Sequence, residues 1–256
     1  MKTFVEDLLH RVQGSVQKYR MFVPGEKVLV ACSGGADSVA LFHLLRELAL
    51  PLGVRLALVH FDHALRLGSA EDFKFVRSLA KTHRAPFYGG RRKQSQRALE
   101  RGLSPEERAR KLRYEFLERV ARRTHTKKIA LGHHSDDQAE TVLMRLIQGT
   151  GLRGLQGIRP VVKMNGVTFI RPLIELSRAE IRRFLKCRAI PHQEDITNRS
   201  RRFLRNRIRS HLLPLLERKF NPRTRESLCR IAETSVQESA GLDEWIAREA
   251  RSFVTA

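Results

Sequence analysis

The sequence is poor in aromatic residues and cysteine and has no long apolar run, and each shortage excludes a class of protein. Aromatic residues make up 7% of the 256 residues and are not interleaved with the charges, which argues against a platform for stacking single-stranded bases. The three cysteines are isolated, which argues against a disulfide framework or a zinc ribbon and suits a reducing compartment. No apolar run approaches the roughly 20 residues of a membrane span, and the first residues lack the apolar core of an export signal. We therefore expect a cytoplasmic protein that does not bind a membrane.

Acidic residues are also scarce beside the basic ones. The sequence has 49 lysines and arginines against 27 aspartates and glutamates, a net charge of +22 and a pI near 11.1. Residues 176–225 hold 15 basic and 4 acidic residues, and residues 91–128 hold 14 and 5. Clustering of this kind, dominated by arginine, indicates a polyanionic partner, with nucleic acid ahead of a membrane surface. Because aromatic residues are few, we expect the protein to hold the phosphate backbone of a folded RNA or a duplex.

Short apolar runs alternate with helical patterns along the first 150 residues. The runs and the patterns between them are predicted, in order, at 27–32, 38–49, 54–61, 69–84, 85–90, 105–123, 127–133 and 136–147. This alternation is typical of an α/β fold, a Rossmann-like parallel sheet with helices on both faces. Ligands bind such sheets at the carboxyl ends of the strands. Polar clusters follow three of the predicted strands, at 33–38, 60–66 and 133–140.

The later part of the sequence changes in character. One more strand is predicted at 168–173, and a capping box over residues 177–180 opens a helix. An arginine-rich helical region follows and is predicted to break near Pro214, before a last helix. We expect two parts, a larger domain over residues 1–216 and a helical C-terminal extension over 217–256.

The stretch VLVACSGGADSVALFHLL (28–45) passes from a predicted strand through a glycine pair into a helical pattern. Its turn places backbone N–H groups and two hydroxyls at a helix N-terminus, which is a ready anion site. Asp37 would repel a bare anion, but it fits a divalent metal ion that bridges it to phosphate oxygens. The turn lacks the G-x-x-x-x-G-K-[ST] pattern of a Walker A loop. It predicts a site for a metal-bound polyphosphate, held by Ser33, Gly34, Gly35, Ala36, Asp37 and Ser38.

A second polar cluster, GHHSDDQAET (132–141), follows the fourth apolar run. On a helix, His133, Asp137 and Glu140 are spaced i, i+4 and i+7 and share one face. Two carboxylates that point into a pocket would receive a cation, either a metal ion or an ammonium group. The preference of acids for a helix N-terminus explains Asp136 and Asp137 but not His133 and Glu140. A dimetal hydrolase could use such a cluster, but it would not need the separate phosphate loop.

Taken in order along the chain, the motifs resemble those of the tRNA(Ile)-lysidine synthetases, which are N-type ATP pyrophosphatases. The motifs are SGGADS (33–38), HFDHALR (60–66), EERARKLRY (106–114), GHHSDDQAETVLMRL (132–146), GTGLRGL (149–155), RPL (171–173), EDITN (194–198) and RNRIR (205–209). The resemblance implies an N-type ATP pyrophosphatase domain, in agreement with the α/β fold expected from the residues. Many members of this family continue into C-terminal domains that help select the tRNA, whereas about 40 residues follow position 216 in this sequence.

The resemblance also implies a reaction and its participants. The family modifies the wobble cytidine of an isoleucine tRNA with a CAU anticodon. ATP, with Mg²⁺, adenylates the C2 oxygen of the cytosine, and pyrophosphate leaves. The ε-amine of free L-lysine then attacks C2 and expels AMP. The expected cofactors are therefore ATP and Mg²⁺, and the expected partners are this tRNA and lysine.

Carried over residue by residue, the resemblance gives each cluster a role. The 33–38 loop would hold the leaving pyrophosphate, with Asp37 on the magnesium ion. Arg113 would neutralise the charge that builds on the α-phosphate. Asp137 and Glu140 would receive the ammonium groups of lysine, and His133 would position or deprotonate the attacking amine.

An arginine run follows the EDITN motif and has no apolar reason to be so basic. The resemblance implies that RNA phosphates are held there by Arg205, Arg207 and Arg209. The alternative is that Arg205 pairs inside the protein with Glu194 or Asp195 and supports the fold.

Other functions stay open from the sequence. A tRNA thiolase of the same superfamily usually carries paired or catalytic cysteines, whereas Cys32, Cys187 and Cys229 form no pair in sequence. A non-catalytic RNA-binding relative with a decayed ATP site would not be expected to keep the loop and the 132–141 cluster. The synthetases of GMP, NAD and asparagine share the loop but have no need of a net charge of +22. The oligomeric state is open, a homodimer included.

Overall fold

The structure is a computed structural model of the chain, which divides into two compact units. The residues that it describes are 2–62, 68–92, 105–193 and 204–254. Unit 1 comprises residues 1–134 and 160–195, and unit 2 comprises residues 135–159 and 196–256. Within the described residues, no helix combines the length and the apolar character needed to cross a membrane.

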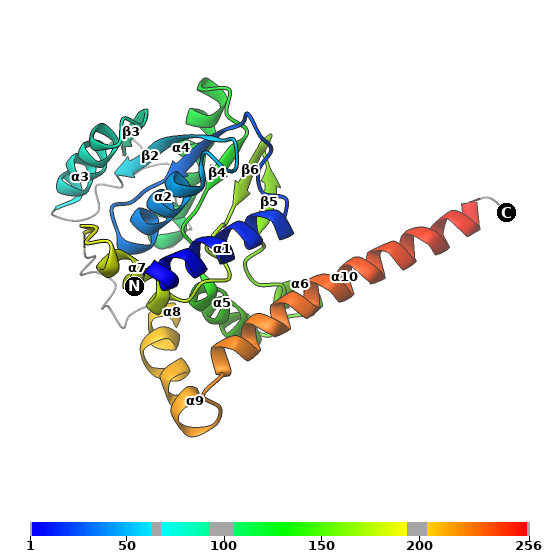
Figure 1. Cartoon of the computed structure of the whole chain (residues 1–256). Helices are drawn as coiled ribbons and strands as arrows, with labels where there is room; N and C mark the ends of the chain where they lie inside the picture. The colour runs from blue at the N-terminus through cyan, green and yellow to red at the C-terminus, as the bar shows by residue number, and fades with distance from the viewer. Residues whose placement is uncertain (1, 63–67, 93–104, 194–203, 255–256) are drawn as a thin grey trace. The chain divides into compact units, whose positions relative to one another are not determined.

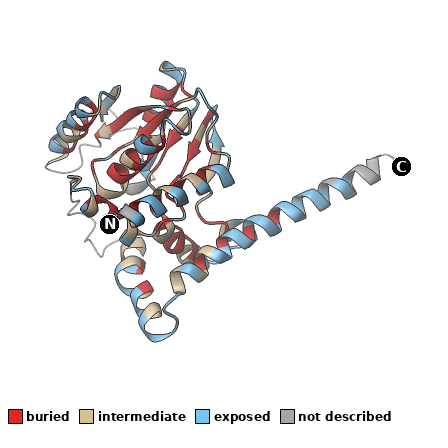
Figure 2. Ribbon diagram, viewed as in Figure 1, coloured by how far each residue is buried: buried red, intermediate tan, exposed pale blue. Residues whose placement is uncertain are grey.

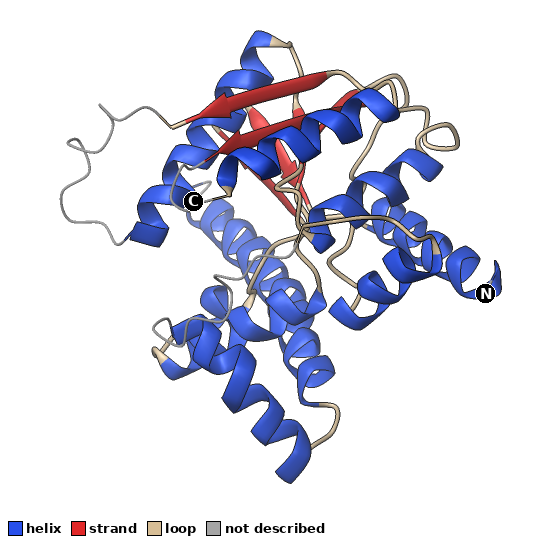
Figure 3. Cartoon of the chain, turned by 90° about the vertical axis from the view of Figure 1, so that its left-hand side faces the viewer, coloured by secondary structure: helices blue, strands red, loops and turns tan. Residues whose placement is uncertain are grey.

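Unit 1 is built on a six-stranded sheet in the order β3-β2-β1-β4-β6-β5 (Figure 1). Figure 3 shows strands of this sheet as red arrows with helices beside them. The strands are β1 (Lys27–Ala31), β2 (Arg55–Asp62), β3 (Phe87–Arg91), β4 (Lys128–Ala130), β5 (Val161–Met164) and β6 (Val167–Ile170). All neighbours pair in parallel except β5 and β6. Helices connect the parallel strands as β-α-β crossovers. The predicted α/β fold class is therefore confirmed.

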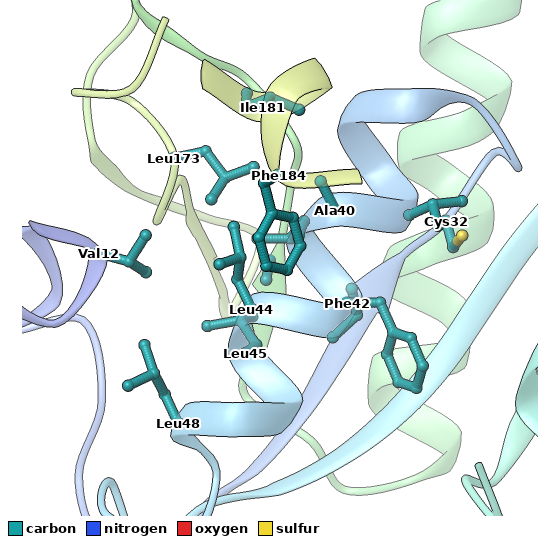
Figure 4. Close-up of a cluster of buried hydrophobic side chains, with 14 of the residues drawn as sticks. Val12, Cys32, Ala40, Phe42, Leu44, Leu45, Leu48, Leu173, Ile181 and Phe184 are labelled. Atoms are coloured by element: carbon teal, nitrogen blue, oxygen red, sulfur yellow. The ribbon is translucent and has the colours of Figure 1, made fainter. Parts of the chain in front are cut away.

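Helices cover both faces of this sheet, as the alternation of buried side chains along β1 requires. Val28 and Val30 belong to a core cluster on one face, together with helices α1, α2 and α7, and Leu29 belongs to a cluster on the other face with α4. Figure 4 shows Phe42 of α2 and Phe184 of α7 within the first cluster, and Figure 2 shows the central strands of the sheet as largely buried. The helices of unit 1 are α1 (Lys2–Lys18), α2 (Ala36–Leu48), α3 (Ser69–Thr82), α4 (Pro105–Arg123) and α7 (Arg178–Cys187).

Strand β5 was not predicted from the sequence, and the sheet is therefore mixed rather than wholly parallel. β5 and β6 form an antiparallel hairpin in which Met164 pairs with Val167. Asn165 (φ 51°) and Gly166 (φ 79°) form its two-residue turn, and both have a positive φ. An Asn-Gly pair between apolar residues is the strongest short-range hairpin signal in a sequence, so this strand was predictable.

Unit 2 is helical. Its elements are α5 (Ser135–Ile147), α6 (Leu152–Leu155), α8 (Leu204–Arg207), the π-helix η3 (Ile208–Leu212), α9 (Leu213–Lys219) and α10 (Thr224–Val254). Ala139 and Val142 of α5 pack with Ile208, Leu213 and Leu228 in its core. The boundary predicted at residue 216 falls inside α9 and stays a prediction.

The break predicted near Pro214 is wrong, because the chain stays helical from Leu204 to Lys219. Pro214, the second residue of α9, has no N–H to donate to the turn before it. The turn before it widens instead: Leu213 N–H donates to the Ile208 carbonyl, a π-type bond. The capping box predicted at 177–180 is confirmed at the start of α7.

Two glycine substitutions test the packing of unit 1. A Cβ at Gly90 of β3 would collide with the ring of Phe116, which is buried and stacks on Phe61 with ring centres 5.1 Å apart. Gly14 is exposed within α1, and a Cβ there meets nothing within 4 Å. We expect Gly90→Ala to lower the free energy of unfolding by about 1–3 kcal/mol, and Gly14→Ala to raise it by about 0.5–1 kcal/mol. Urea denaturation followed by circular dichroism measures both, and an equal loss in the two variants would contradict this packing.

Candidate functional site

The loop between β1 and α2 is held in one conformation by its own side chains. Gly34 has φ +94°, a conformation that favours glycine. The Ser38 hydroxyl donates to the Gly35 carbonyl (2.9 Å) and accepts from the Ser33 N–H (3.1 Å). The Gly34 carbonyl in turn accepts from the Gln193 N–H (2.9 Å). The first N–H groups of α2 therefore follow a fixed, glycine-lined turn, which is a suitable cradle for phosphate oxygens.

The chain that follows β4 lies against this loop. A Cβ on Gly132 would lie 3.1 Å from the carbonyl oxygen of Asp37, so only a glycine allows the backbones to approach as closely without adjustment. His134 is 1% exposed, and its Nε2 lies 3.6 Å from Asp37 Oδ2. The 33–38 loop and residues 132–134 thus meet at the carboxyl ends of β1 and β4, where parallel sheets bind their ligands.

The donor set of the loop fits a phosphate-bound magnesium ion better than a self-sufficient metal centre. Among the described residues, no group of three or more His, Cys, Asp or Glu side chains could hold a metal. Asp37 is the carboxylate of the loop, and about one third of its side chain is exposed. Magnesium is usually bound through one or two carboxylates, with phosphate oxygens and waters as its other ligands, and Asp37 beside a phosphate cradle matches that pattern.

A group of cationic side chains surrounds Tyr114 of α4. The guanidinium carbons of Arg110 and Arg113 lie 5.2 and 5.8 Å from the centre of its ring, which contacts Phe169 of β6. The Arg113 Nε is buried and has no hydrogen-bond partner among the described residues. Burial lowers the pKa of the Arg113 guanidinium. A desolvated arginine interacts more strongly with an anion than an exposed one does, which supports the phosphate role predicted for Arg113.

Arg171 belongs to the same group and was missed as a site residue. Its side chain is 5% exposed, and its Nε donates to Nδ1 of His133 (3.2 Å). Burial lowers the pKa of Arg171, and the nearby Tyr114 opposes this effect. The sequence contained a signal, because Arg171 opens the RPL motif (171–173) and is a charged residue within the apolar strand predicted at 168–173.

The cluster at residues 60–66 is described only in part. His60 donates from Nδ1 to the carbonyl of Cys32 (2.8 Å), and burial lowers its pKa. Asp62 pairs with Arg91 (3.2 Å). His63 and Arg66, which complete this motif, lie outside the described residues.

The cysteines are unpaired, and two of them are poorly suited to nucleophilic chemistry. Burial raises the pKa of Cys32, beside the loop, to about 11, and it raises the pKa of Cys229 in unit 2 to about 11. Both are therefore thiols at neutral pH, whereas the thiolate is the nucleophile. Cys187 is also free.

In unit 2, the two predicted cation-receiving carboxylates do receive cations, and these come from the chain itself. Arg205 donates from Nε to Glu140 Oε2 (2.9 Å) and from Nη2 to Asp137 Oδ1 (2.9 Å). Arg209 donates from Nη2 to Glu140 Oε2 (2.8 Å) and to Asp137 Oδ1 (3.2 Å). Glu140 is 1% exposed. Arg207, between the two arginines, is exposed.

Two expectations about these residues change. His133 does not share a helical face with Asp137 and Glu140, because α5 begins at Ser135 and His133 precedes it, in unit 1. Asp136 is paired with Arg225 (3.0 Å). The alternative partners proposed for Arg205, residues 194 and 195, lie outside the described residues.

Comparison with known proteins finds relatives over most of the chain. A tRNA(Ile)-lysidine synthase of Geobacter sulfurreducens is 40% identical over 257 residues, which cover 99% of this chain and 54% of that protein. A tRNA(Ile)-lysidine synthase of Solibacter usitatus is 43% identical over 224 residues, which cover 86% of this chain and 48% of that protein. The chain thus spans about half the length of the curated relatives it matches.

A solved structure shows the same fold. The U34-tRNA thiolase NcsA from Methanococcus maripaludis, solved with its [4Fe-4S] cluster, superposes with a TM-score of 0.78 over 93% of this chain and 81% of that one. The two sequences are 18% identical, so the likeness concerns the fold alone. A family model described as a PP-loop domain matches residues 7–216, which include the loop at 33–38. This chain belongs to the PP-loop domain family.

Proposed function

We propose that this chain catalyses the attachment of lysine to the wobble cytidine of the CAU-anticodon isoleucine tRNA, with ATP as the source of energy. The observation that carries the proposal is the 33–38 loop, a phosphate cradle that presents the Asp37 carboxylate at the carboxyl ends of β1 and β4. The 40% identity to a tRNA(Ile)-lysidine synthase over 99% of the chain supports the choice of substrates. The net charge of +22 supports an RNA partner, and the three free cysteines suit the cytoplasm.

The first step of the proposed reaction is adenylation of the C2 oxygen. The loop would hold the β- and γ-phosphates that leave as pyrophosphate, through backbone N–H groups and the hydroxyls of Ser33 and Ser38. Asp37 would hold Mg²⁺, which when bound would neutralise charge on the phosphate oxygens. Arg113 would stabilise the charge that develops at the α-phosphate, and its desolvation strengthens that interaction.

The second step requires a site for lysine. Asp137 and Glu140 already accept hydrogen bonds from the guanidinium groups of Arg205 and Arg209. A guanidinium and an ammonium group are both cationic donors, so the same carboxylates suit an ammonium group of lysine. Lysine would then either share these oxygens with the two arginines or displace one of them.

The thiolase alternative is less well supported. A thiolase needs a sulfur nucleophile or a cluster held by cysteines, and Cys32 and Cys229 are thiols at neutral pH because burial raises the pKa of each. A purely RNA-binding role would leave unexplained the hydrogen bonds that hold the 33–38 loop as a phosphate cradle.

The direct test follows the fate of ATP labelled at the α- or γ-phosphate. We expect AMP and pyrophosphate to form only when Mg²⁺ and the CAU-anticodon isoleucine tRNA are present, and lysidine to form only when lysine is added. The methionine tRNA, which shares the anticodon sequence before modification, measures discrimination by this chain. Asp37→Asn, which keeps the volume and loses the charge, serves as the inactive control. Release of ADP and phosphate instead would show that the assigned chemistry is wrong.

A second prediction separates the two steps. We expect Glu140→Gln and Asp137→Asn to raise the KM for lysine by at least about tenfold, because each removes a charge-assisted hydrogen bond to the ammonium group. Pyrophosphate release before lysine addition should change by less than about threefold. Asp136→Asn, one residue away and paired with Arg225, is the matched control and should leave the KM for lysine unaltered. Equal failure of both steps in Glu140→Gln would place this carboxylate in the adenylation machinery.

A third prediction distinguishes the three arginines. Arg207 is exposed, so Arg207→Ala should reduce the salt slope of tRNA binding by about one unit and leave the melting temperature unchanged. Arg205→Ala and Arg209→Ala each remove a partner of the buried Glu140 carboxylate, which should cost about 1–3 kcal/mol of folding free energy. Titrations with tRNA across a salt series, beside thermal melts, measure both effects. If Arg207→Ala leaves the slope unchanged, this arginine does not contact the RNA backbone.

A further inference from the structure

A buried arginine fixes the orientation of a half-buried histidine at the carboxyl ends of β4 and β6. Arg171 follows β6 directly, and its Nε lies 3.2 Å from Nδ1 of His133, which follows β4. The main chain of Arg171 is held by two hydrogen bonds. Its N–H donates to the Pro160 carbonyl (3.0 Å), and its carbonyl accepts from the Ile174 N–H (3.1 Å). The sheet therefore sets the position of the guanidinium group and, through it, that of the imidazole.

The chemistry of the two groups decides which ring nitrogen carries the proton. The Nε of arginine always carries a hydrogen and has no lone pair to offer, because the guanidinium group is not deprotonated in proteins. Nδ1 of His133 must then be the acceptor, which places the proton of the neutral ring on Nε2. A proton on Nδ1 would face the N–H of Arg171, two donors with no acceptor between them.

His60, which lies in β2, shows the opposite arrangement. Its Nδ1 lies 2.8 Å from the carbonyl oxygen of Cys32, which can only accept, so Nδ1 carries the proton. Its Nε2 is buried and has no hydrogen-bond partner among the described residues. The protein thus holds two histidines, one in β2 and one that follows β4, with opposite tautomers, and a hydrogen bond at Nδ1 sets each of them.

We propose that Arg171 is a positioning residue that keeps His133 neutral with its proton on Nε2, so that His133 acts as a hydrogen-bond donor to a substrate oxygen. This inference rests on the proposed function and deepens it. The oxygen belongs to the phosphate chain of ATP or to the adenylated cytosine, the two groups that gain or carry negative charge. His133 is then not the base that takes the proton of the lysine amine.

The surroundings of Arg171 agree with the role proposed for His133 as a hydrogen-bond donor. Arg110 and Arg113 lie around the ring of Tyr114, and this tyrosine and Arg110 both act on the charge of Arg171. Such a cluster of cations attracts phosphate oxygens. A neutral donor in that place adds a directed hydrogen bond without a further positive charge, and it needs no change of protonation during the reaction.

The first test reads the tautomer directly and does not depend on activity. In the full chain labelled with ¹⁵N-histidine, long-range ¹H–¹⁵N spectra show which ring nitrogen carries the proton, and His133→Gln assigns the signals. We expect His133 in the wild type to carry its proton on Nε2 at neutral pH, and Arg171→Met, which keeps the chain length and lacks the donor, to lose this preference. A wild-type His133 with its proton on Nδ1, or on both nitrogens, would overturn the proposal. Because no substrate is present, this result is independent of whether the chain makes lysidine.

The second test keeps Arg171 in place, since removal of a buried arginine can itself unfold the protein. A glutamine at position 133 can donate a hydrogen bond from its amide but cannot take a proton from an amine. We expect His133→Gln to keep adenylation within about tenfold of the wild type, and His133→Ala to lose about a hundredfold or more. Thermal melts confirm that both variants fold. Equal losses in the glutamine and alanine variants would overturn the donor role, and a chain that makes no AMP at all would instead contradict the proposed function.

Discussion

The parallel pairing of β1, β4 and β6 is the constraint on which the site in unit 1 depends. Val30 pairs with Ala130, and Ala130 pairs with Ile170, so the three strands end at the same edge of the sheet. The chain leaves these strands into the 33–38 loop, the His133–His134 segment and Arg171, respectively. A slip of one residue in either pairing would turn the side chains of a strand to the opposite face and separate these groups. Strand register therefore fixes the chemistry as well as the core.

Much of this arrangement could be predicted from the sequence because it depends on local signals. The alternation of apolar runs with helical patterns predicted the sheet and its helices, and the capping box at residues 177–180 marked the start of α7. The exception, β5, also had a local signal in Asn165–Gly166, whose positive φ angles form the hairpin turn. What the sequence could not supply is the contact between Arg171 and His133, 38 residues apart, because it exists only through the register of two strands.

The arginine–carboxylate group of unit 2 shows the same limit. The sequence identified Asp137 and Glu140 as residues that bind a cation, and Arg205 and Arg209 as residues that bind an anion. It treated them as two separate sites, because the carboxylates and the arginines that pair are 65 or more positions apart in the sequence. In the folded unit the buried carboxylates and the guanidinium groups neutralise one another, as buried charges must. The π-helix at 208–212 places Arg209 beside Glu140 within this cluster, and π-turns are frequent at functional sites.

The two histidines of the sheet show how one residue type takes different roles in the same fold. One hydrogen bond sets the tautomer of each: the carbonyl of Cys32 accepts from Nδ1 of His60, and the guanidinium of Arg171 donates to Nδ1 of His133. Phosphate chemistry favours such fixed groups, since the oxygens gain charge during the reaction and a preset donor stabilises that charge without rearrangement. In the proposed tautomer, Nδ1 of His133 accepts from the Arg171 N–H and Nε2 carries the proton, so neither nitrogen is available to take up a further proton. In the proposed reaction, the loop, the arginines and His133 would form a set of fixed donors and cations, and the proton of the attacking amine would leave by way of another group.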